Sequence, residues 1–445
     1  MDLNYDNYLM ENYGIQFEII EMSRVAMQDI EECLKDIRNI SEYNQLKVLS
    51  AMKDLGLSDF HLNDSTGYGY SDVGRDTIED IYKMVFKAED AIVRPQIISG
   101  THAITLCLYG VLRPGDELLS VTGTPYDTLY DVINGTDCGS LKDFNIQYSE
   151  VALLANGEPD YETISKRLND NTKMVMIQRS RGYNLRPALT IEEIRRLIGF
   201  IKYLNPNITC FVDNCYGEFV ENKEPIEVGA DLCAGSLIKN LGGGIAPAGG
   251  YVVGREKLIS QCFSRLTVPG LDKSCGPSLQ TNRMIAQGLF YAPLIVGEAL
   301  KGGIFTSRLL ELAGFDVFPK HDEKRSDIVT AAILGDRKRL INFCEGLQAV
   351  GPVDARVAPI PWAMPGYDNE IIMAAGCFIQ GASIELSADA PLRPPYVIYI
   401  QGGLNFTHVK VGVMSALQRL VNHGYELKAG LSNRARCKTR TDKDS

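Results

Sequence analysis

One lysine in a glycine-rich stretch is the first candidate for chemistry in this chain. Residues 231–254 read DLCAGSLIKNLGGGIAPAGGYVVG, with Lys239 between two short apolar segments and Ser236 three residues before it. A lysine on a loop is usually a solvent-exposed cation. The apolar flanks predict burial here, and a buried lysine is paired, neutralised or used in a reaction. Lys239 is therefore a candidate reactive group.

An aspartate ends a second apolar segment. Residues 208–219 read ITCFVDNCYGEF, and the apolar run stops at Asp213. A buried carboxylate needs a partner. Two interpretations stay open: Asp213 forms a salt bridge or a helix cap, or it lies beneath the pyridinium nitrogen of a bound group.

The turn Ser99-Gly100-Thr101-His102 separates a short apolar segment from an apolar helix. A glycine turn at a helix start offers free backbone N–H groups and the positive end of the helix dipole, which suit a phosphate. The pattern is weak by itself, because many strand-to-helix turns contain Ser-Gly. His102 either caps the helix start or acts on a ligand as a stacking or acid–base group.

Aromatic residues and an arginine lie in two polar loops. The loop 63–76, NDSTGYGYSDVGRD, contains Tyr68, Tyr70 and Arg75. It is either a surface turn cluster or a ligand loop in which Arg75 binds an anion. Tyr126 directly follows a predicted strand, and ligands of open α/β sheets collect at the carboxyl ends of strands.

Alternating strands and helices must position these residues. Between residues 92 and 254 short apolar segments alternate with helical patterns, which is typical of a mostly parallel sheet with helices on both faces. The capping patterns Thr190/Glu193 and Asp76/Glu79 each predict a helix start. Helical spacing also covers residues 17–40, about 42–55 and 281–301, and the predicted strands are 117–121, 174–178 and 208–213.

The chain is expected to divide into several regions. Beyond about residue 300, short strands mixed with helices suggest a smaller unit. The predicted fold class is therefore α/β, with a mostly parallel sheet and a smaller C-terminal α+β domain. The expected regions are an N-terminal helical arm at 1–60, a large ligand-binding domain at 61–300, a small domain at 301–430 and a disordered tail at 431–445.

The composition limits the function classes. The 445 residues are 45% hydrophobic and carry a formal net charge of −11 without a basic stripe, which disfavours nucleic-acid binding. No uninterrupted apolar run approaches the roughly 20 residues of a membrane helix, and the N-terminus does not resemble a signal peptide. Cysteines without a CxxC pattern indicate free thiols in a reducing compartment. We therefore expect a cytoplasmic protein.

Several segments occur in the order found in fold-type I pyridoxal-phosphate enzymes. SGTHAI, VDNCY and GSLIKN resemble the phosphate turn, strand end and lysine segment of the cystathionine γ-synthase and methionine γ-lyase group. Over about residues 60–420 the chain is similar to the methionine γ-lyase-like family, also named aluminium-resistance proteins. The similarity rests on long motifs such as TGYGYSDVGRDT, RPQIISGTHAI, VLRPGDELL, QRSRGY, FCEGLQAVGPVDA, MPGYDNEIIMAAG and PPYVIYIQGGL.

The resemblance implies a pyridoxal 5'-phosphate cofactor and assigns roles to matching residues. Lys239 would bind the cofactor as a Schiff base and move the substrate's α-proton. Asp213 would keep the ring nitrogen protonated. The backbone of Gly100 and Thr101 and the hydroxyl of Ser236 would bind the phosphate.

Further roles follow from the same resemblance. Tyr126 would stack on the ring and protonate a leaving thiolate. Tyr70 and Arg75 would reach the phosphate of a neighbouring subunit, so that active sites are shared in a homodimer or homotetramer. Asn184 would contact the ring's 3-oxygen, and Arg393 would bind the substrate carboxylate.

The chain departs from the family pattern at three places. Ile238 stands where the better-known lyases have a threonine, so one phosphate hydroxyl is missing. His102 replaces a small residue, and both Tyr68 and Tyr70 are available for one role. The pocket that selects the substrate side chain therefore differs, and methionine cannot be assumed as the substrate.

The resemblance implies a lyase that cleaves a C–S bond of a sulfur-containing amino acid by β- or γ-elimination, giving a thiol, ammonia and a 2-oxo acid. The same cofactor and fold also serve racemases, aminotransferases and decarboxylases. A non-enzymatic metal-stress protein is another alternative, although the acidic residues are dispersed and predict no metal site. We expect an amino-acid substrate and neither a nucleic acid nor a membrane as partner.

Overall fold

The larger of two sheets has seven strands, and the candidate site lies at the carboxyl ends of several of them. The computed structural model describes residues 3–364 and 369–427. The strand order is β1-β7-β6-β5-β4-β2-β3; β7 is antiparallel to both neighbours, and the other pairs are parallel. The strands are β1 Asp90–Arg94, β2 Glu117–Ser120, β3 Gln147–Glu150, β4 Thr172–Gln178, β5 Thr209–Asp213, β6 Leu232–Ser236 and β7 Gly250–Gly254.

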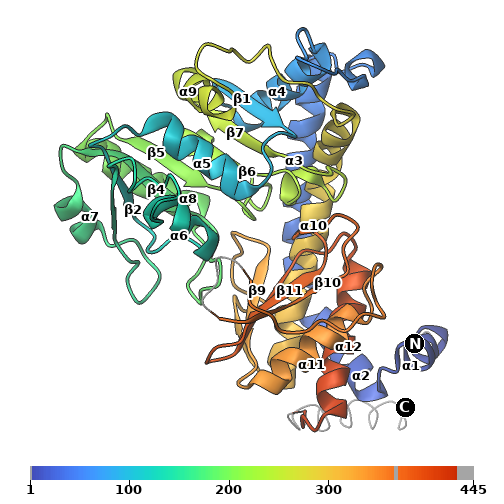
Figure 1. Cartoon of the computed structure of the whole chain (residues 1–445). Coiled ribbons are helices and arrows are strands. Elements are labelled where there is room, and N and C mark those ends of the chain that lie inside the picture. Colours follow the sequence, from blue (N-terminus) through green and yellow to red (C-terminus); the bar gives the residue numbers. More distant parts are fainter. Residues whose placement is uncertain (1–2, 365–368, 428–445) are drawn as a thin grey trace.

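Helices cover both faces of this sheet, as the sequence predicts (Figure 1). Successive side chains of a strand point to opposite faces, so Met174 and Met176 of β4 enter one hydrophobic core and Val175 and Ile177 the other. The first core is closed by α5 Gly100–Val111, α6 Asp127–Asn134 and α9 Glu256–Leu266, and the second by α7 Tyr161–Arg167 and α8 Ile191–Leu204.

A second, smaller sheet is antiparallel, with the order β10-β11-β12-β9-β8. One face packs on helices in the largest hydrophobic core, and the other carries a small cluster that includes Val329 and Tyr399 and contacts Tyr183 and Tyr216 of the larger sheet's loops. This confirms the smaller α+β unit. Its elements are β8 Asp316–Phe318, β9 Val329–Ile333, α11 Arg337–Gln348, β10 Ile371–Ala375, β11 Ser387–Pro391, β12 Val397–Gln401 and α12 Phe406–Asn422.

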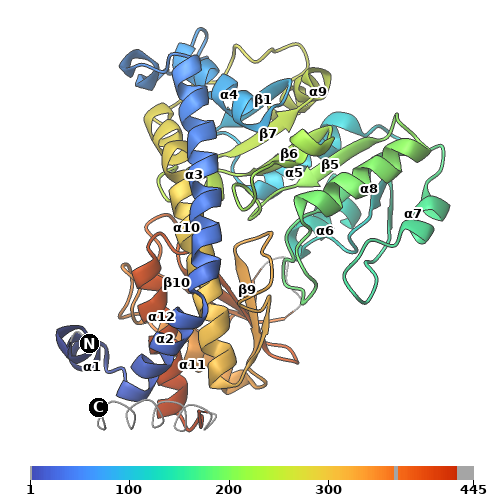
Figure 2. The ribbon, with the colours of Figure 1, turned by 180° about the vertical axis from the view of Figure 1, so that it is seen from behind.

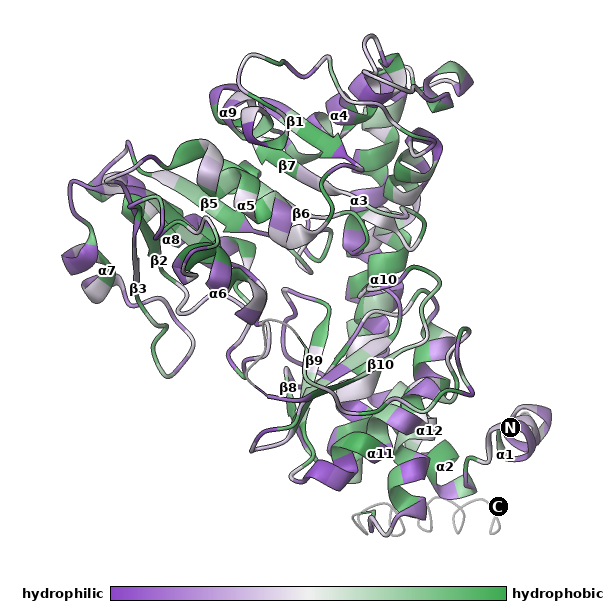
Figure 3. Cartoon of the chain, viewed as in Figure 1, coloured by the Kyte–Doolittle hydropathy of each residue, from purple (hydrophilic) through white to green (hydrophobic). Residues whose placement is uncertain are grey.

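A long helix, α10 Asn282–Ala313, runs beside both sheets (Figure 2). Its length and apolar composition would suit a membrane span, but 67% of its most apolar window is buried inside the protein, as expected of a core helix. In Figure 3 the strands of the larger sheet are coloured mostly as hydrophobic. The expected domain boundary at residue 300 falls inside this helix. The boundary itself stays a prediction.

The N-terminal helices pack on this chain's own body. Ile19, Ile20 and Ile37 belong to the same core as α10, and α3 runs alongside α10 (Figure 2). The remaining elements are α1 Leu3–Tyr13, α2 Phe17–Asp29, α3 Glu31–Asp54, α4 Val73–Phe86, and the short 3₁₀ helices η1 Asp59–Leu62, η2 Pro225–Val228 and η3 Asn240–Gly242. The predicted tail at 431–445 lies outside the described residues.

Two predicted helix boundaries were wrong. The N-terminal helix breaks at Ile30, not near residue 41, and α3 then continues unbroken. Helix α4 begins at Val73, because the Asp72 side chain accepts the Arg75 N–H at 2.9 Å and caps it. Glu79, which was predicted to form a capping box with Asp76, pairs with Arg94 instead.

Glu79 and Arg94 form a buried ion pair between α4 and β1. Arg94 Nε donates to Glu79 Oε1 at 2.6 Å, and both side chains are under 5% exposed. The same guanidinium donates to the carbonyls of Lys273 and Cys275 at 2.8 and 2.9 Å. The pair therefore also holds the loop that precedes α10.

Replacing Arg94 by methionine should destabilise the protein by about 3–5 kcal/mol, because it leaves the Glu79 carboxylate buried without its main partner. The measurement is the midpoint of thermal or urea unfolding. Arg337→Met is the matched control, since the Arg337–Glu370 pair is about half exposed and contributes little. Equal midpoints for the two variants would contradict the assigned importance of the buried pair.

Candidate active site

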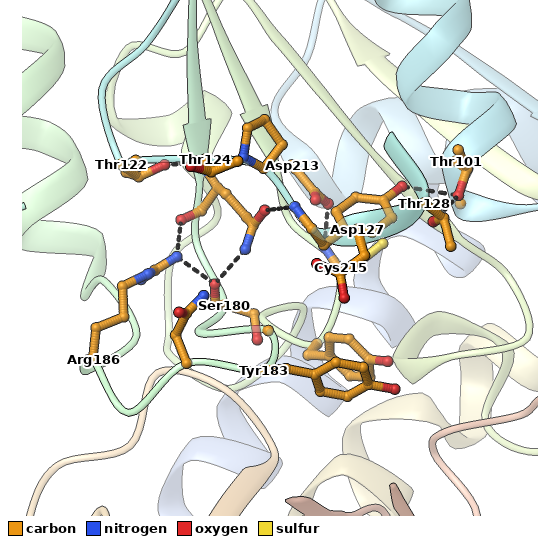
Figure 4. Close-up of a pocket in the computed structure, with 18 of the residues that line it drawn as sticks. Thr101, Thr122, Thr124, Asp127, Thr128, Ser180, Tyr183, Arg186, Asp213 and Cys215 are labelled. Carbon is orange, nitrogen blue, oxygen red and sulfur yellow. Dashed lines mark hydrogen bonds between the residues drawn. The ribbon is translucent and has the colours of Figure 1, made fainter. Parts of the chain in front are cut away.

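A cavity of about 630 Å³ lies where β2, β4, β5 and β6 end (Figure 4). Parallel strands bring their carboxyl ends to one edge of a sheet, which is the usual ligand position in such folds. Eight of the ten predicted site residues line it: Gly100, Thr101, Tyr126, Asn184, Asp213, Ser236, Lys239 and Arg393.

The start of α5 forms the predicted cradle. Ser99 caps the helix by accepting the His102 N–H at 3.0 Å. A side chain at Gly100 would lie 3.2 Å from Cys215 Sγ and 3.4 Å from Ser236 Cβ, so glycine allows the helix start to approach β6. Free N–H groups and the buried Ser236 hydroxyl then face one space, which fits a phosphate.

His102 serves the turn and not the cavity. Its Nδ1 accepts the N–H of Ile98 at 3.2 Å, and the ring lies outside the main cavity. Burial lowers the pKa of His102, which favours the neutral ring. The sequence left open whether His102 caps the helix start or acts on a ligand, and the hydrogen bond to Ile98 fits a structural role at the helix start.

Asp213 is buried at the end of β5 and accepts the Cys215 N–H at 3.1 Å. Within residues 3–364 and 369–427 it forms neither an ion pair nor a helix cap. Burial raises the pKa of the Asp213 carboxyl, against the opposing effect of Lys239. A buried carboxylate that faces the cavity without a cationic partner fits a protonated ring nitrogen.

Lys239 follows β6 and projects into the same cavity. Its Nζ lies 3.9 Å from the ring centroid of Tyr216, and it makes no ion pair within the part of the chain that the structure describes. Burial lowers the Lys239 pKa, but the groups around it, Cys215, Tyr216 and Asp213 foremost, outweigh this effect and bring the pKa well above its ordinary value.

Glycines behind Lys239 fix its position. A side chain at Gly242 would lie 1.7 Å from the Leu237 carbonyl oxygen, and one at Gly243 would lie 2.5 Å from the Gly288 carbonyl oxygen of α10. Gly243 also has φ = +54°, a left-handed conformation that glycine adopts without strain. The turn is therefore pressed against α10, and Lys239 is held towards Asp213.

Gln178 positions Tyr126. The sequence analysis did not identify Gln178 as a site residue. Gln178 ends β4, and its Oε1 accepts the Tyr126 N–H at 3.0 Å. The Tyr126 hydroxyl donates to Thr101 Oγ1 at 2.9 Å, and Thr128 Oγ1 lies 3.4 Å from the same atom (Figure 4). Burial raises the pKa of Tyr126, so the phenol stays protonated near neutral pH.

Two arginines line the cavity. Arg393 lies exposed on the turn between β11 and β12, at the rim, and Asn184 lies near it. Arg186, which the sequence analysis missed, donates to the carbonyls of Gln178 and Ser180 (Figure 4). Burial lowers the pKa of Arg186 to about 10, still far above neutrality. Arg393 is the cation whose guanidinium is accessible to an incoming anion.

Arg75 requires a correction. It is 2% exposed and lies outside the cavity. Its Nε and Nη2 donate to Asp76 Oδ1 at 2.9 and 2.7 Å. Its Nη1 donates to the carbonyls of Gly69 and Gly276, both at 2.7 Å, and its Nη2 also to Ser274 at 3.1 Å. All five N–H groups are used within the chain, so none remains for a neighbour's phosphate.

The loop that Arg75 fixes presents two tyrosines to solvent. Tyr68 and Tyr70 are 73% and 58% exposed, and their rings stack with centroids 5.7 Å apart. Tyr70 is outside this chain's own cavity, as expected of a residue that would serve a neighbouring chain. Its role there stays a prediction.

The site residues that the sequence analysis missed differ in how readily the sequence could have revealed them. Tyr216 and Cys215 belong to the VDNCY segment, so their proximity to Asp213 was readable from the sequence. Gln178 is a polar residue at the end of an apolar strand, which is a weaker signal. Arg186 carried none, because its contacts are with backbone carbonyls.

Known proteins resemble most of the chain. The family model described as methionine gamma-lyase matches residues 19–421. The uncharacterized protein YnbB of Bacillus subtilis (strain 168) is 52% identical, over 90% of this chain and 96% of that protein. The carbon-sulfur lyase involved in aluminum resistance from Clostridium novyi NT has a crystal structure that is 49% identical, with a TM-score of 0.91 over 94% of this chain and 100% of that chain.

A more distant structure shares the fold alone. The pyridoxal-5'-phosphate dependent protein YhfS from Escherichia coli is 16% identical, with a TM-score of 0.59 over 86% of this chain and 97% of that chain. The likeness agrees with the mostly parallel sheet and the smaller antiparallel sheet described above.

Arg75→Ala should lower the free energy of unfolding by about 3 kcal/mol, because the buried carbonyl of Gly69 and the partly buried hydrogen bonds to Gly276 and Ser274 lose their donor. Urea unfolding measures the effect. Arg195→Ala, on an exposed face of α8, should leave the midpoint close to that of the unchanged protein. Unchanged stability in Arg75→Ala together with weaker pyridoxal phosphate binding would restore the original expectation.

Proposed function

The chain belongs to the methionine gamma-lyase family, and on this premise we propose that it is a pyridoxal-phosphate-dependent lyase. It cleaves a C–S bond of a sulfur-containing amino acid by β- or γ-elimination and releases a thiol, ammonia and a 2-oxo acid. The observation that carries the proposal is the convergence of Lys239, Asp213 and the start of α5 in one cavity.

The cofactor site is built from three strand ends and a helix start. The N–H groups of Gly100 and Thr101 and the Ser236 hydroxyl bind the phosphate, and the glycine leaves room for it. Asp213 would pair with the ring nitrogen. Bound pyridoxal phosphate supplies an electron sink for the substrate's α-carbon. Ile238 has no hydroxyl to offer the phosphate. A nearby alternative is the Thr128 hydroxyl, which lies beside that of Thr101.

The remaining residues bind and move protons. Arg393 binds the substrate carboxylate, because its guanidinium lies at the rim and matches a carboxylate in two hydrogen bonds. Lys239, once neutral, takes the α-proton at its Nζ. The Tyr126 phenol, which burial keeps protonated, gives its proton to the leaving sulfur. Asn184, which lines the cavity, would bind the ring's 3-oxygen.

The active site is shared between subunits. We propose a homodimer or homotetramer in which Tyr70 or its neighbour Tyr68 reaches the other chain's phosphate, since both rings are exposed on a loop anchored by Arg75. The proposal includes a cytoplasmic location and a small amino-acid substrate. A racemase, aminotransferase or decarboxylase would use the same lysine and aspartate, so the products distinguish these reactions.

The purified protein should be yellow, and borohydride should attach the cofactor permanently to Lys239, as read by peptide mass spectrometry. Lys239→Ala should lose the attachment and all turnover, whereas exposed Lys257→Ala should keep both. A panel of sulfur amino acids should yield 2-oxo acid and thiol. A cofactor-loaded protein that is silent across the panel would point to another reaction of the same fold.

Asp213→Asn should keep the cofactor but lower kcat by about 10²–10³-fold, because a neutral amide no longer holds the ring nitrogen protonated. The cofactor's absorbance and steady-state kinetics measure the two effects separately. Asp213→Glu keeps the charge and should recover part of the rate. Full activity of Asp213→Asn would remove Asp213 from the proposed machinery.

A further inference from the structure

The turn after β5 holds Tyr216 in an unusual backbone conformation. Tyr216 has φ = +71°, a left-handed value that favours glycine and is rare for an aromatic residue. The Gly217 N–H donates to the Asn214 carbonyl at 2.8 Å and closes the turn. A side chain at Gly217 would lie 2.5 Å from Arg179, so the surrounding packing enforces this turn. Such strain is retained where the side chain's direction matters.

That direction places the Tyr216 ring on the Lys239 ammonium. Nζ lies 3.9 Å from the ring centroid, well inside the range of a cation–π contact. The contact is stronger where the cation is partly shielded from water, and Lys239 is partly buried beside hydrophobic clusters against which Tyr216 packs. No ion pair competes with it among the described residues.

Burial disfavours the charged forms of the other titratable groups around Lys239. Burial raises the pKa of Cys215 and Tyr126 far above neutrality. Burial raises the pKa of Glu218 to about 8, and it also raises the pKa of the Asp389 carboxyl. Burial also raises the pKa of the Asp213 carboxyl, and the Tyr216 ring is the group in direct contact with the ammonium.

The Tyr216 hydroxyl is fixed as well. It lies 3.2 Å from Ser383 Oγ, on the loop that leads into β11 of the smaller sheet. The ring is thus held at one end by its strained turn and at the other by the part of the chain that carries Arg393. Tyr216 spans the space between Lys239 and the smaller sheet.

We propose that Tyr216 is a positioning residue whose ring holds the Lys239 side chain towards Asp213 and stabilises its ammonium form, and so sets the pH at which the lysine becomes a free amine. The inference rests on the proposed function only in taking Lys239 as the reactive lysine. It names no reaction and does not depend on the substrate.

The sign of the effect follows from the contact. A cation–π contact favours the charged form of the lysine, which raises its pKa. Replacing the ring by an apolar side chain of similar size removes this stabilisation without opening the site further to water. The Lys239 pKa should therefore fall in Tyr216→Leu and stay in place in Tyr216→Phe, which keeps the ring.

The test is competitive labelling of the full, cofactor-free chain with acetic anhydride between pH 7 and 12.5, with Lys239 acetylation read by peptide mass spectrometry. Only the neutral amine reacts, so the midpoint reports the Lys239 pKa. Tyr216→Leu should lower the midpoint by about one pH unit or more, and Tyr216→Phe should leave it unchanged. Lys257 in the same samples is the internal control.

Tyr216→Gly guards against a folding failure, because glycine suits the left-handed backbone. It also lowers the midpoint, by less than leucine does, since water can enter and solvate the ammonium. An unchanged or raised midpoint in the leucine variant overturns the proposal, as does a fall in Tyr216→Phe as large as in Tyr216→Leu. If the leucine variant does not fold, an unchanged or raised midpoint in Tyr216→Gly overturns it. The readout needs no turnover, so a failed lyase assay leaves this result intact.

Discussion

A partly buried lysine that forms no salt bridge among the described residues is the constraint on which the site depends. Lys239 is pressed forward by glycines that pack against α10, and it meets the turn after β5, where Asp213 and Tyr216 lie. Enclosing a charged amine is costly unless nearby groups stabilise it. The two strand ends and the long helix must therefore be held in register for the lysine to be usable. The glycine turn and the strained Tyr216 turn both serve this requirement.

Much of the fold and the centre of the site could be predicted from sequence. Alternation of apolar strands and amphipathic helices indicates a parallel sheet, and parallel strands bring their carboxyl ends together. Lys239, Asp213 and Gly100 lie at or next to such ends, so their convergence follows from local patterns. The capping pair Thr190 and Glu193 was also correct, because it uses contacts three residues apart.

The remainder depends on contacts between residues far apart in the chain. Arg75 looked like an anion-binding residue, but carbonyls of Ser274 and Gly276, some 200 residues away, take two of its five N–H groups, and Asp76 and Gly69 take the others. Glu79 resembled a helix cap and instead pairs with Arg94. Local spacing does not reveal such partners. The short strands β8 and β10 are set by pairing with neighbours and carry little pattern of their own.

The single helix α10 contributes to the packing beside both sheets, since it contacts the turn behind Lys239 at one end and β8, β9 and α12 at the other. Because both sheets depend on α10, they cannot be exchanged between relatives as independent units. Recombination between relatives at residue 300 would join the front half of one α10 to the rear half of another, and each half would meet unfamiliar side chains. Loops at the strand ends can diverge one at a time, whereas α10 must change in step with two partners at once.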